Sequence, residues 1–383
     1  MSEWRIPLSD LDYDRAEEEA VLRVLRSKWL SMGAEVEAFE REFASSVGSQ
    51  YAIAVANGTA ALQLAFLALG LGPGDEVIQP ALNFVAAANM TVATGASPVF
   101  ADILGIDEPT IEPEEISRRI TANTKAVVVM HYAGYLSRMS RISEICRNHG
   151  LALIEDACHA VGARYLDPEH ISPNGKMAGN LGDIGCFSFF SNKNMAIGEG
   201  GMVTTNHEDL AQTIRLLRSH GMTTLTWDRH QGHADTYDVQ LNGLNCRLDE
   251  IHAALGRVQL QKLQKNNERR KQLVSNYKRQ LCGLDGWVFP FENYQGSSSY
   301  HLAVFVAPDG DRRSRVVRAL KEARIQTSLH YPYIPSFKAF KGIPADSLER
   351  SKEFAQRAIT LPLFPGMTEA QVEETCSIIR SIV

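Results

Sequence analysis

The chain has 383 residues, of which 44% are hydrophobic and 22% are charged. These fractions are typical of a soluble globular protein, and the length predicts two domains, or one large domain with a smaller one appended. A formal net charge of −6 provides no basic surface for nucleic acid, so we expect no such partner. The apolar segments contain glycines and polar residues and are too short to span a membrane, which excludes a membrane protein.

The cysteines and the N-terminal segment predict a cytoplasmic protein. None of the six cysteines forms a C-x-x-C pair, and in a chain of this size they are typical of reduced core thiols. The N-terminal segment MSEWRIPLSDLDYD is acidic and lacks the apolar core of a secretory signal. The cysteines are Cys146, Cys158, Cys186, Cys246, Cys282 and Cys376.

Two amphipathic helices are predicted first along the chain. In the segment DYDRAEEEAVLRVLRSKWL (12–30), the apolar residues lie mostly on one side of a helix. In the segment AEVEAFEREFASSVG (34–48), apolar residues recur at spacings of three and four, and Gly48 marks the expected end.

Seven short apolar runs follow, and helical stretches or loops separate most of them. This alternation predicts an α/β domain in which helices flank a mostly parallel central sheet. The runs are YAIAVA (51–56), EVIQPA (76–81), SPVFADI (97–103), KAVVVMHY (125–132), LALIEDA (151–157), DIGCFSFF (183–190) and GGMVTTN (200–206).

From about Asn245 the pattern is helical again, and the segment 247–281 predicts one long helix or two joined helices. A smaller α+β region follows. It has predicted strands at 297–307 and 326–331 and predicted helices at 312–325 and 367–383. We therefore expect a large domain over residues 1–255 and a small C-terminal domain over residues 256–383. The N-terminal segment is a further element that can pack on the small domain.

The residues that follow the predicted strands form the candidate site, because ligands of parallel α/β sheets bind at the carboxyl ends of the strands. Asn57, Gly58 and Thr59 follow the first run and begin a helix. They offer free N–H groups and a hydroxyl to an anion such as phosphate, although simple helix capping is the alternative. Phe84 follows the second run and could stack on a flat cofactor or belong to the core.

The later strand ends supply a carboxylate and a lysine. Asp156 lies at the end of the fifth run, next to its last residue, and could pair with a pyridinium N–H or cap a helix. Lys193 lies five residues beyond Ser188, at the end of an aromatic run and before a glycine cluster. A phosphate cradle, a stacking ring, a carboxylate and a lysine together are the groups that bind pyridoxal 5′-phosphate.

On these residues the chain resembles the fold-type I, pyridoxal-phosphate-dependent sugar aminotransferases of the DegT/DnrJ/EryC1/StrS family. The resemblance implies a homodimer with shared active sites, besides the two-domain layout. The matching stretches keep the family order over nearly the whole chain. They are SKWLSMGAEVEAFEREFA, ANGTAALQLAFLALGLGPGDEVIQPALNFVAAANM, LIEDACHAVGA, GCFSFFSNKNMAIGEGGMVTT, LNCRLDEIHAALG, QTSLHYPYIPSFKAF and LPLFPGMTEAQVE.

The resemblance also implies roles for individual residues. Lys193 matches the catalytic lysine that forms a Schiff base with the cofactor, and Asp156 matches the carboxylate that binds the pyridine nitrogen. His159 matches a position beside the ring or its O3′ group, and Phe84 matches the stacking aromatic residue. Phosphate contacts are implied for Gly58, Thr59 and Ser188, and for Asn245 from the partner subunit. Substrate contacts are implied for Trp29, Met32, Gly33, His330 and Tyr331.

The implied reaction is the transfer of an amino group from L-glutamate to a keto sugar, for amino-sugar and polysaccharide biosynthesis. The implied acceptor is a nucleotide-linked 3-keto or 4-keto 6-deoxy sugar, and a cyclitol is the alternative. Some family members carry histidine in place of the lysine and dehydrate sugars, and Lys193 argues against that activity. The residue types do not identify the nucleotide or the carbon that is aminated.

Three other interpretations are weaker. A cofactor-binding regulator would need a separate DNA-binding segment, and the sequence shows none. An aminotransferase for amino acids alone would need an arginine for the α-carboxylate, and nothing selects Arg247 or Arg324 for that role. The segment RHQGH (229–233) has two histidines but no further ligands nearby, so we predict a polar loop and no metal site.

Overall fold

The structure is a computed structural model, and it describes residues 4–167, 175–224, 227, 232 and 235–383. A seven-stranded sheet with the order β1-β7-β6-β5-β4-β2-β3 lies at its centre. β7 runs antiparallel to β1 and β6, and the other neighbouring pairs are parallel. The predicted α/β fold with a mostly parallel sheet is thus confirmed.

Each of the seven predicted runs coincides with one strand of this sheet, to within one or two residues at either end. The strands are β1 (Tyr51–Val55), β2 (Glu76–Pro80), β3 (Ser97–Ala101), β4 (Thr124–Met130), β5 (Ala152–Asp156), β6 (Ile184–Ser188) and β7 (Gly201–Thr205).

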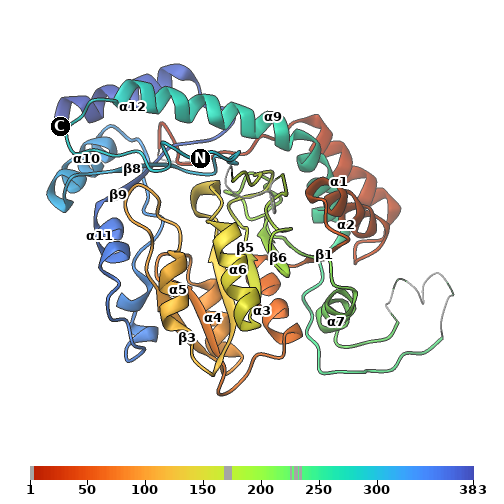
Figure 1. Cartoon of the computed structure of the whole chain (residues 1–383). Coiled ribbons are helices and arrows are strands. Elements are labelled where there is room, and N and C mark those ends of the chain that lie inside the picture. The colour runs from red at the N-terminus through yellow and green to blue at the C-terminus, as the bar shows by residue number, and fades with distance from the viewer. Residues whose placement is uncertain (1–3, 168–174, 225–226, 228–231, 233–234) are drawn as a thin grey trace.

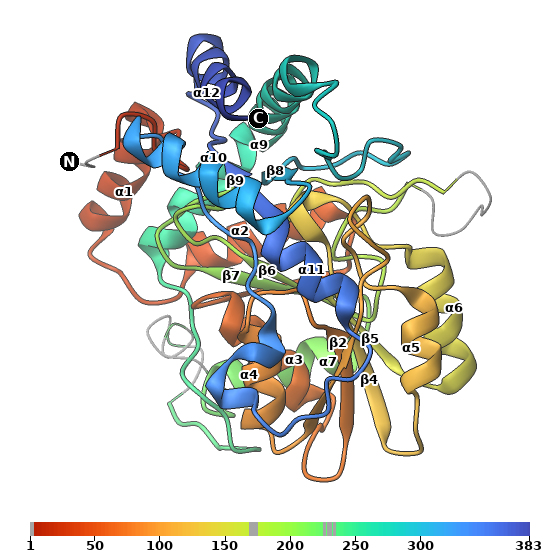
Figure 2. The same ribbon diagram turned by 90° about the vertical axis from the view of Figure 1, so that its left-hand side faces the viewer.

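The strands read as continuous apolar runs because both faces of the sheet are covered by helices (Figures 1 and 2). In β4, Val127 and Val129 pack with the cluster that includes α2, α5 and α6. Ala126 and Val128 point to the other face and pack with α3, α4 and α7. The helices are α2 (Ala34–Val47), α3 (Gly58–Ala68), α4 (Ala86–Ala93), α5 (Pro113–Arg119), α6 (Met139–His149) and α7 (Glu208–Arg218).

Most of the C-terminal elements lie above the sheet in Figure 1, with α9 (Glu250–Leu281) running along the top, whereas α11 (Glu349–Arg357) lies beside the sheet. The alternatives left open by the sequence are resolved, because α9 is one helix of 32 residues. It passes through the predicted domain boundary at residues 255 and 256, and that boundary stays a prediction. The remaining elements are α1 (Arg15–Ser27), β8 (Ala303–Val306), α10 (Gly310–Glu322), β9 (Ala358–Leu361), α12 (Glu369–Ile382) and the short 3₁₀ helices η1 (Tyr132–Gly134), η2 (Ile334–Ser336) and η3 (Lys338–Phe340).

The second, smaller sheet differs from its prediction. β8 pairs antiparallel with β9, a strand of four residues that precedes a proline and that the sequence pattern did not reveal. The expected strand at 326–331 does not form. That segment has a single bridge from Ser328 to Thr360, so it runs beside β9 without joining the sheet.

The N-terminal segment packs on the C-terminal elements, as its sequence allowed. Ile6 is buried in the same core cluster as residues of α9, β8, β9, α10 and α12. The backbone N–H of Arg5 donates to the carbonyl of Arg324 at 2.9 Å, and Gln326 donates to the carbonyl of Ile6 at 2.9 Å.

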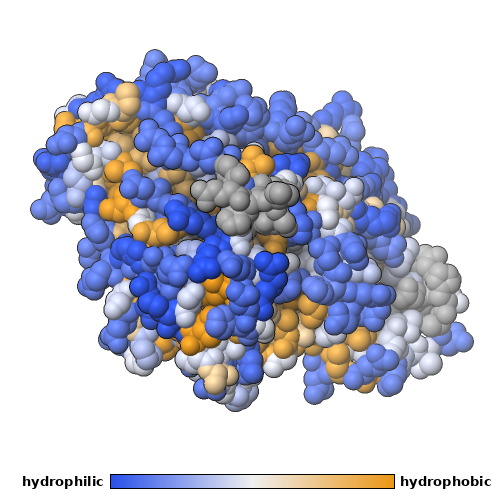
Figure 3. Space-filling model, viewed as in Figure 1, coloured by the Kyte–Doolittle hydropathy of each residue, from blue (hydrophilic) through white to orange (hydrophobic). Residues whose placement is uncertain are grey.

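Figure 3 shows hydrophilic residues over much of the visible face, with smaller apolar patches between them. Within the described residues, no helix is both long enough and apolar enough to cross a bilayer. α9 has sufficient length, but it carries many lysines and arginines.

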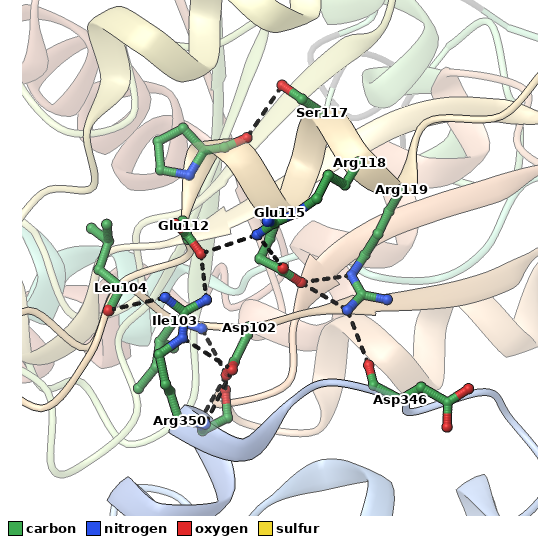
Figure 4. Close-up of polar contacts among 12 residues, drawn as sticks. Asp102, Ile103, Leu104, Glu112, Glu115, Ser117, Arg118, Arg119, Asp346 and Arg350 are labelled. Carbon is green, nitrogen blue, oxygen red and sulfur yellow. Dashed lines mark hydrogen bonds and ion pairs between the residues drawn. The ribbon is translucent and has the colours of Figure 1, made fainter.

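A buried aspartate fixes α11 against the edge of the large sheet (Figure 4). Asp102 follows β3, and its carboxylate accepts hydrogen bonds from the backbone N–H of Ser351 at 2.7 Å and of Arg350 at 3.1 Å. The guanidinium of Arg350 also pairs with Asp102, with Nε at 3.2 Å. Nearby, Arg119 donates to the carbonyl of Asp346 at 3.1 Å. Asp102 therefore caps a helix that lies far away in sequence.

We expect Asp102→Ala to destabilise the protein by about 1–3 kcal/mol, because it leaves the backbone N–H groups of Arg350 and Ser351 without their acceptor. Arg118→Ala is the control, because the Arg118 side chain is 62% exposed and its partner Glu115 still pairs with Arg119 in its absence. That change should cost less than about 1 kcal/mol. Urea unfolding measures both, and equal losses in the two variants would contradict the role of Asp102.

Candidate active site

A cavity of about 430 Å³ opens at the carboxyl ends of the central strands and the start of α3. It brings together most of the residues that the sequence selected. Those that line it are Gly58, Thr59, Phe84, Asp156, His159, Ser188, Lys193, His330 and Tyr331.

Asp156 lies at the end of β5 and is 3% exposed. The side-chain amide of Asn83 donates to its Oδ2 at 3.2 Å, and the backbone N–H of Cys158 donates to its Oδ1 at 3.3 Å. Two donors do not exhaust the acceptor capacity of a carboxylate, so Asp156 can bind a further N–H that enters the cavity.

The neighbouring Glu155 points to the opposite side of β5 and anchors a loop. Its Oε1 accepts hydrogen bonds from the backbone N–H groups of Leu181 and Gly182, both at 2.7 Å. Its Oε2 accepts one from Gly179 at 2.9 Å and lies 2.9 Å from Nε2 of His131. With four partners and no exposed surface, this carboxylate holds the segment that leads into β6.

Lys193 reaches the cavity from the loop after β6. Its backbone N–H donates to the carbonyl of Phe190 at 2.8 Å, whereas no residue in the described part of the chain forms a hydrogen bond or ion pair with its side-chain amine. Burial lowers the pKa of Lys193, and the charges of Cys158 and Asp156 oppose this shift. The fraction of neutral amine at a given pH is therefore larger than for a lysine in water.

The start of α3 lies directly against the end of β6. A Cβ on Gly58 would lie 2.8 Å from Cβ of Ser188 and 3.2 Å from Sγ of Cys158, so this approach requires glycine. Asn57 caps the helix with its side chain. The N–H groups of Gly58 and Thr59 have no partner within the helix, because they belong to its first turn. They therefore provide an anion site on the cavity wall.

Aromatic and imidazole rings form another wall. Phe84 is 53% exposed, which excludes a place in the core, and its ring centroid lies 5.8 Å from that of Tyr331. The hydroxyl of Tyr331 lies 2.6 Å from Nε2 of His159. Burial, followed by the nearby Lys193 and His301, holds the pKa of His159 well below its usual range, so this imidazole is neutral.

Three polar lining residues were not selected from the sequence, although each is next to one that was or lies in the glycine cluster. Asn83 precedes Phe84, Asn192 precedes Lys193, and Glu199 lies within the cluster. Their side chains are placed by loops that carry no periodic pattern. The sequence signal that could have found them was their adjacency alone.

Four predicted residues lie outside the lining of this cavity. Asn245 is exposed and forms an isolated bridge with Ser219. Met32 is buried in the core, and Gly33 donates its N–H to Glu250 at 2.9 Å. The fourth is Trp29, whose ring centroid lies 4.9 Å from that of Trp227. A ligand contact for any of them stays a prediction.

Within the described residues, no group of three or more His, Cys, Asp and Glu side chains could hold a metal ion. The predicted polar loop RHQGH lies outside the described part of the chain, except for Gly232. All six cysteines are free thiols.

The cavity residues fit pyridoxal 5′-phosphate. The helix start at Gly58 suits the phosphate, the unfilled acceptor capacity of Asp156 suits a pyridinium N–H, and the amine of Lys193 faces both without an ionic partner in the described chain. The exposed ring of Phe84 offers a flat apolar surface.

Comparison with known proteins points to the same chemistry. A model of the "DegT/DnrJ/EryC1/StrS aminotransferase family" matches residues 12–380. The chain is 38% identical to the spore coat polysaccharide biosynthesis protein SpsC of Bacillus subtilis over 379 residues, or 96% of this chain and 95% of that protein. Its structure is similar to that of DesV from S. venezuelae, solved with a ketimine intermediate, with a TM-score of 0.88 and 32% identity over 98% of each chain. PseC of Helicobacter pylori, an aminotransferase of pseudoaminic acid biosynthesis, gives a TM-score of 0.89 and 27% identity over 98% of each chain.

The lowered pKa of Lys193 predicts a stability that depends on pH. Unfolding returns the lysine to its usual pKa of about 10.4, so between the folded and unfolded pKa values the unfolded chain binds more protons. The free energy of unfolding therefore rises with pH between the two pKa values. Below the folded-state pKa, Lys193 is charged although it is buried, which destabilises the folded protein. We expect cofactor-free Lys193→Met to be more stable than wild type at neutral pH, with a difference that shrinks as the pH approaches about 10.4.

Thermal unfolding of the cofactor-free proteins at several pH values measures this difference. Lys125→Met is the control, because Lys125 is exposed on β4 and should show no such trend. A wild type that is at least as stable as Lys193→Met at neutral pH would contradict the argument.

Proposed function

The chain belongs to the DegT/DnrJ/EryC1/StrS aminotransferase family, and from this premise we propose that it uses pyridoxal 5′-phosphate to transfer an amino group from L-glutamate to a keto sugar. Aminotransferases are transferases of the EC 2.6.1 type. The observation that supports the proposal best is a single cavity in which Lys193, Asp156 and the start of α3 meet.

The cofactor would be held at its reactive carbon, its ring and its phosphate. Lys193 would bind it covalently, and Asp156 would accept the hydrogen bond of its ring nitrogen. Phe84 would stack on the ring, and His159 would lie beside it. The phosphate contacts that we propose within the chain are Gly58, Thr59 and Ser188.

Each side chain of the cavity would have a separate role in amino transfer. When bound, the cofactor supplies a cationic ring that takes up the electron pair left when a C–H bond beside the amino group breaks. Lys193, which would leave the cofactor when the donor amine takes its place there, would accept that proton on its neutral amine and later return it, as general base and then general acid. Asp156, oriented by Asn83, would place its carboxylate at the ring nitrogen. His159 is held by Tyr331 and, being neutral, adds no competing positive charge.

The same cavity would receive donor and acceptor in turn, which is ping-pong logic. We propose a nucleotide-linked 3-keto or 4-keto 6-deoxy sugar as acceptor, in cytoplasmic amino-sugar biosynthesis. The names of SpsC and PseC, which refer to a polysaccharide and to pseudoaminic acid, support a carbohydrate. A cyclitol is the alternative acceptor, and Lys193 disfavours a dehydratase. A screen of keto sugars, cyclitol ketones and keto acids against the amine-loaded protein distinguishes these substrates.

The central test is the identity of the covalent lysine. Borohydride reduction of the cofactor-loaded protein should fix the cofactor on Lys193, as read by peptide mass spectrometry. Lys193→Ala should lose amino transfer from L-glutamate, because no base remains at that position. Lys125→Ala, at an exposed lysine, is the matched control and should keep both the label and the activity. Recovery of the label on another lysine would overturn the assignment.

Asp156→Asn tests the electronic role of the carboxylate. The variant keeps the shape of the side chain, so we expect the cofactor still to bind. The single-turnover rate with L-glutamate should fall by about 100-fold or more, since a hydrogen bond to a charged group is worth about 1.5–3 kcal/mol and more when it acts in the transition state. Turnover near the wild-type rate would show that Asp156 is only structural.

Asn245 leads to a proposal about assembly. It is exposed and lies outside the cavity of its own chain, in the segment that enters α9. We propose that it contacts the phosphate in the site of a partner subunit. Exposed leucines on and just after α1, with 43% for Leu22, 48% for Leu25 and 47% for Leu30, offer an apolar surface for such a homodimer. The proposed substrate contacts Trp29, Met32 and Gly33 would then also belong to the partner's site.

Mixed dimers test this arrangement. The homodimers of Lys193→Ala and of Asn245→Asp should each have little or no amino-transfer activity. The second change should do so because it places a carboxylate next to the negatively charged phosphate. In a mixed dimer both lesions fall in one site, so activity should recover to about half of the wild-type value per dimer if the sites are independent. A lack of recovery in verified mixed dimers, or a fully active monomer, would contradict the shared site.

A further inference from the structure

The side chain of Asn194 determines which nitrogen of His301 carries the hydrogen. Its Nδ2 donates to the backbone carbonyl of Ser299 and to Oδ1 of Asn267, both at 2.7 Å. Its Oδ1 therefore faces Nδ1 of His301, 2.9 Å away, and can only accept a hydrogen bond. His301 thus carries its hydrogen on Nδ1, and Nε2 presents a lone pair.

That lone pair has no partner among the described residues. Burial, together with the charges of Lys193 and Arg270, holds the pKa of His301 well below its usual range, so the ring stays neutral and Nε2 stays an acceptor. Oδ1 of Asn192 is a second buried acceptor without a partner in the described chain. Both acceptors belong to or contact the loop that carries Lys193. A buried acceptor that is left unpaired costs stability, so one donor that serves both would stabilise this loop.

A small cavity of about 20 Å³ lies where both of these side chains meet the C-terminal elements. Both this volume and the threshold refer to the space that the centre of a water molecule can occupy, and about 10–15 Å³ is enough for one water. The lining also includes two hydroxyl side chains, Ser9 and Thr360. The other lining residues are Leu8, Leu302, His330, Leu361 and Leu363.

We propose that this cavity is the site of one structural water, which donates one hydrogen to Nε2 of His301 and the other to Oδ1 of Asn192. Water fits because both orphan atoms are acceptors and one water supplies two hydrogens. An ammonium ion is disfavoured by the nearby cations Lys193 and Arg270, and an anion has no hydrogen to donate. The hydroxyl of Ser9 can serve the remaining lone pairs of the water.

The consequence is that one imidazole holds the residues on both sides of Lys193. Through Nδ1, His301 binds Asn194 directly, and through Nε2 and the water it binds Asn192. His301 is therefore a positioning residue for the lysine, although it does not line the active-site cavity. This role does not depend on the proposed cofactor or acceptor.

Two variants separate the nitrogens of His301. The side-chain amide of His301→Asn overlays Nδ1, so it keeps the bond to Asn194 and loses the acceptor for the water. The amide of His301→Gln overlays Nε2, so it keeps the acceptor and loses the bond to Asn194. Crystal structures of the cofactor-free wild type and both variants, at a resolution that shows ordered waters, give the direct test.

We expect a water within hydrogen-bonding distance of both acceptors in wild type and in His301→Gln, and its loss or displacement in His301→Asn. The backbone N–H of Lys193, which bonds to Phe190, should exchange with solvent several-fold faster in His301→Asn than in wild type. An empty cavity in the wild-type protein would overturn the proposal, and so would a water that keeps its place in His301→Asn. If His301→Asn does not fold, the presence or absence of the water in the wild-type and His301→Gln structures still tests the proposal.

Discussion

The start of α3 can lie against the end of β6 only because residue 58 has no side chain. A Cβ on Gly58 would overlap Ser188, and a Cβ on Gly201 would lie 2.6 Å from the backbone of Asn57. These two glycines let a helix N-terminus, with its free N–H groups and positive dipole end, approach the edge of a sheet closely. The same edge carries Asp156 and, one loop further, Lys193. Anion site, carboxylate and amine are therefore neighbours because two backbone segments can touch.

β5 shows how the same side-chain type takes two roles through direction alone. Successive side chains of a strand point to opposite faces of the sheet. The side chain of Glu155 therefore points toward the segment before β6, and that of Asp156 points into the cavity. Glu155 has four hydrogen-bond partners and fixes the segment that becomes β6. Asp156 has two and keeps capacity for a ligand. Glu155 therefore stabilises the fold, whereas Asp156 can still accept a hydrogen bond from a ligand in the cavity.

The large sheet was predictable from the sequence because its strands are buried on both faces and so appear as continuous apolar runs. Gly58, Thr59, Phe84, Asp156 and Lys193 could be selected from that prediction, since parallel strands end at one edge. The family resemblance supplied the other site residues: His159, Ser188, His330 and Tyr331. The four residues of β9 were too few to give a pattern, and segment 326–331 reads as a strand although Ser328 alone pairs with β9. The contacts of Asn83, Glu199 and His301 depend on loops that meet only after folding. The proposed phosphate contact of Asn245 involves a second chain, which no single-chain pattern contains.

The position of β1 at the edge of the sheet has a consequence for how the protein is made. β1 pairs with β7, Tyr51 opposite Thr205 and Val55 opposite Gly201. During synthesis at about 5–20 residues per second, β1 leaves the ribosome on the order of ten seconds before its partner. Until then it is an apolar segment without its neighbour, and a long loop must close before the pairing stabilises it. The anion site at Gly58 begins immediately after β1, so the part of the active site that is translated first is among the last to take its final place.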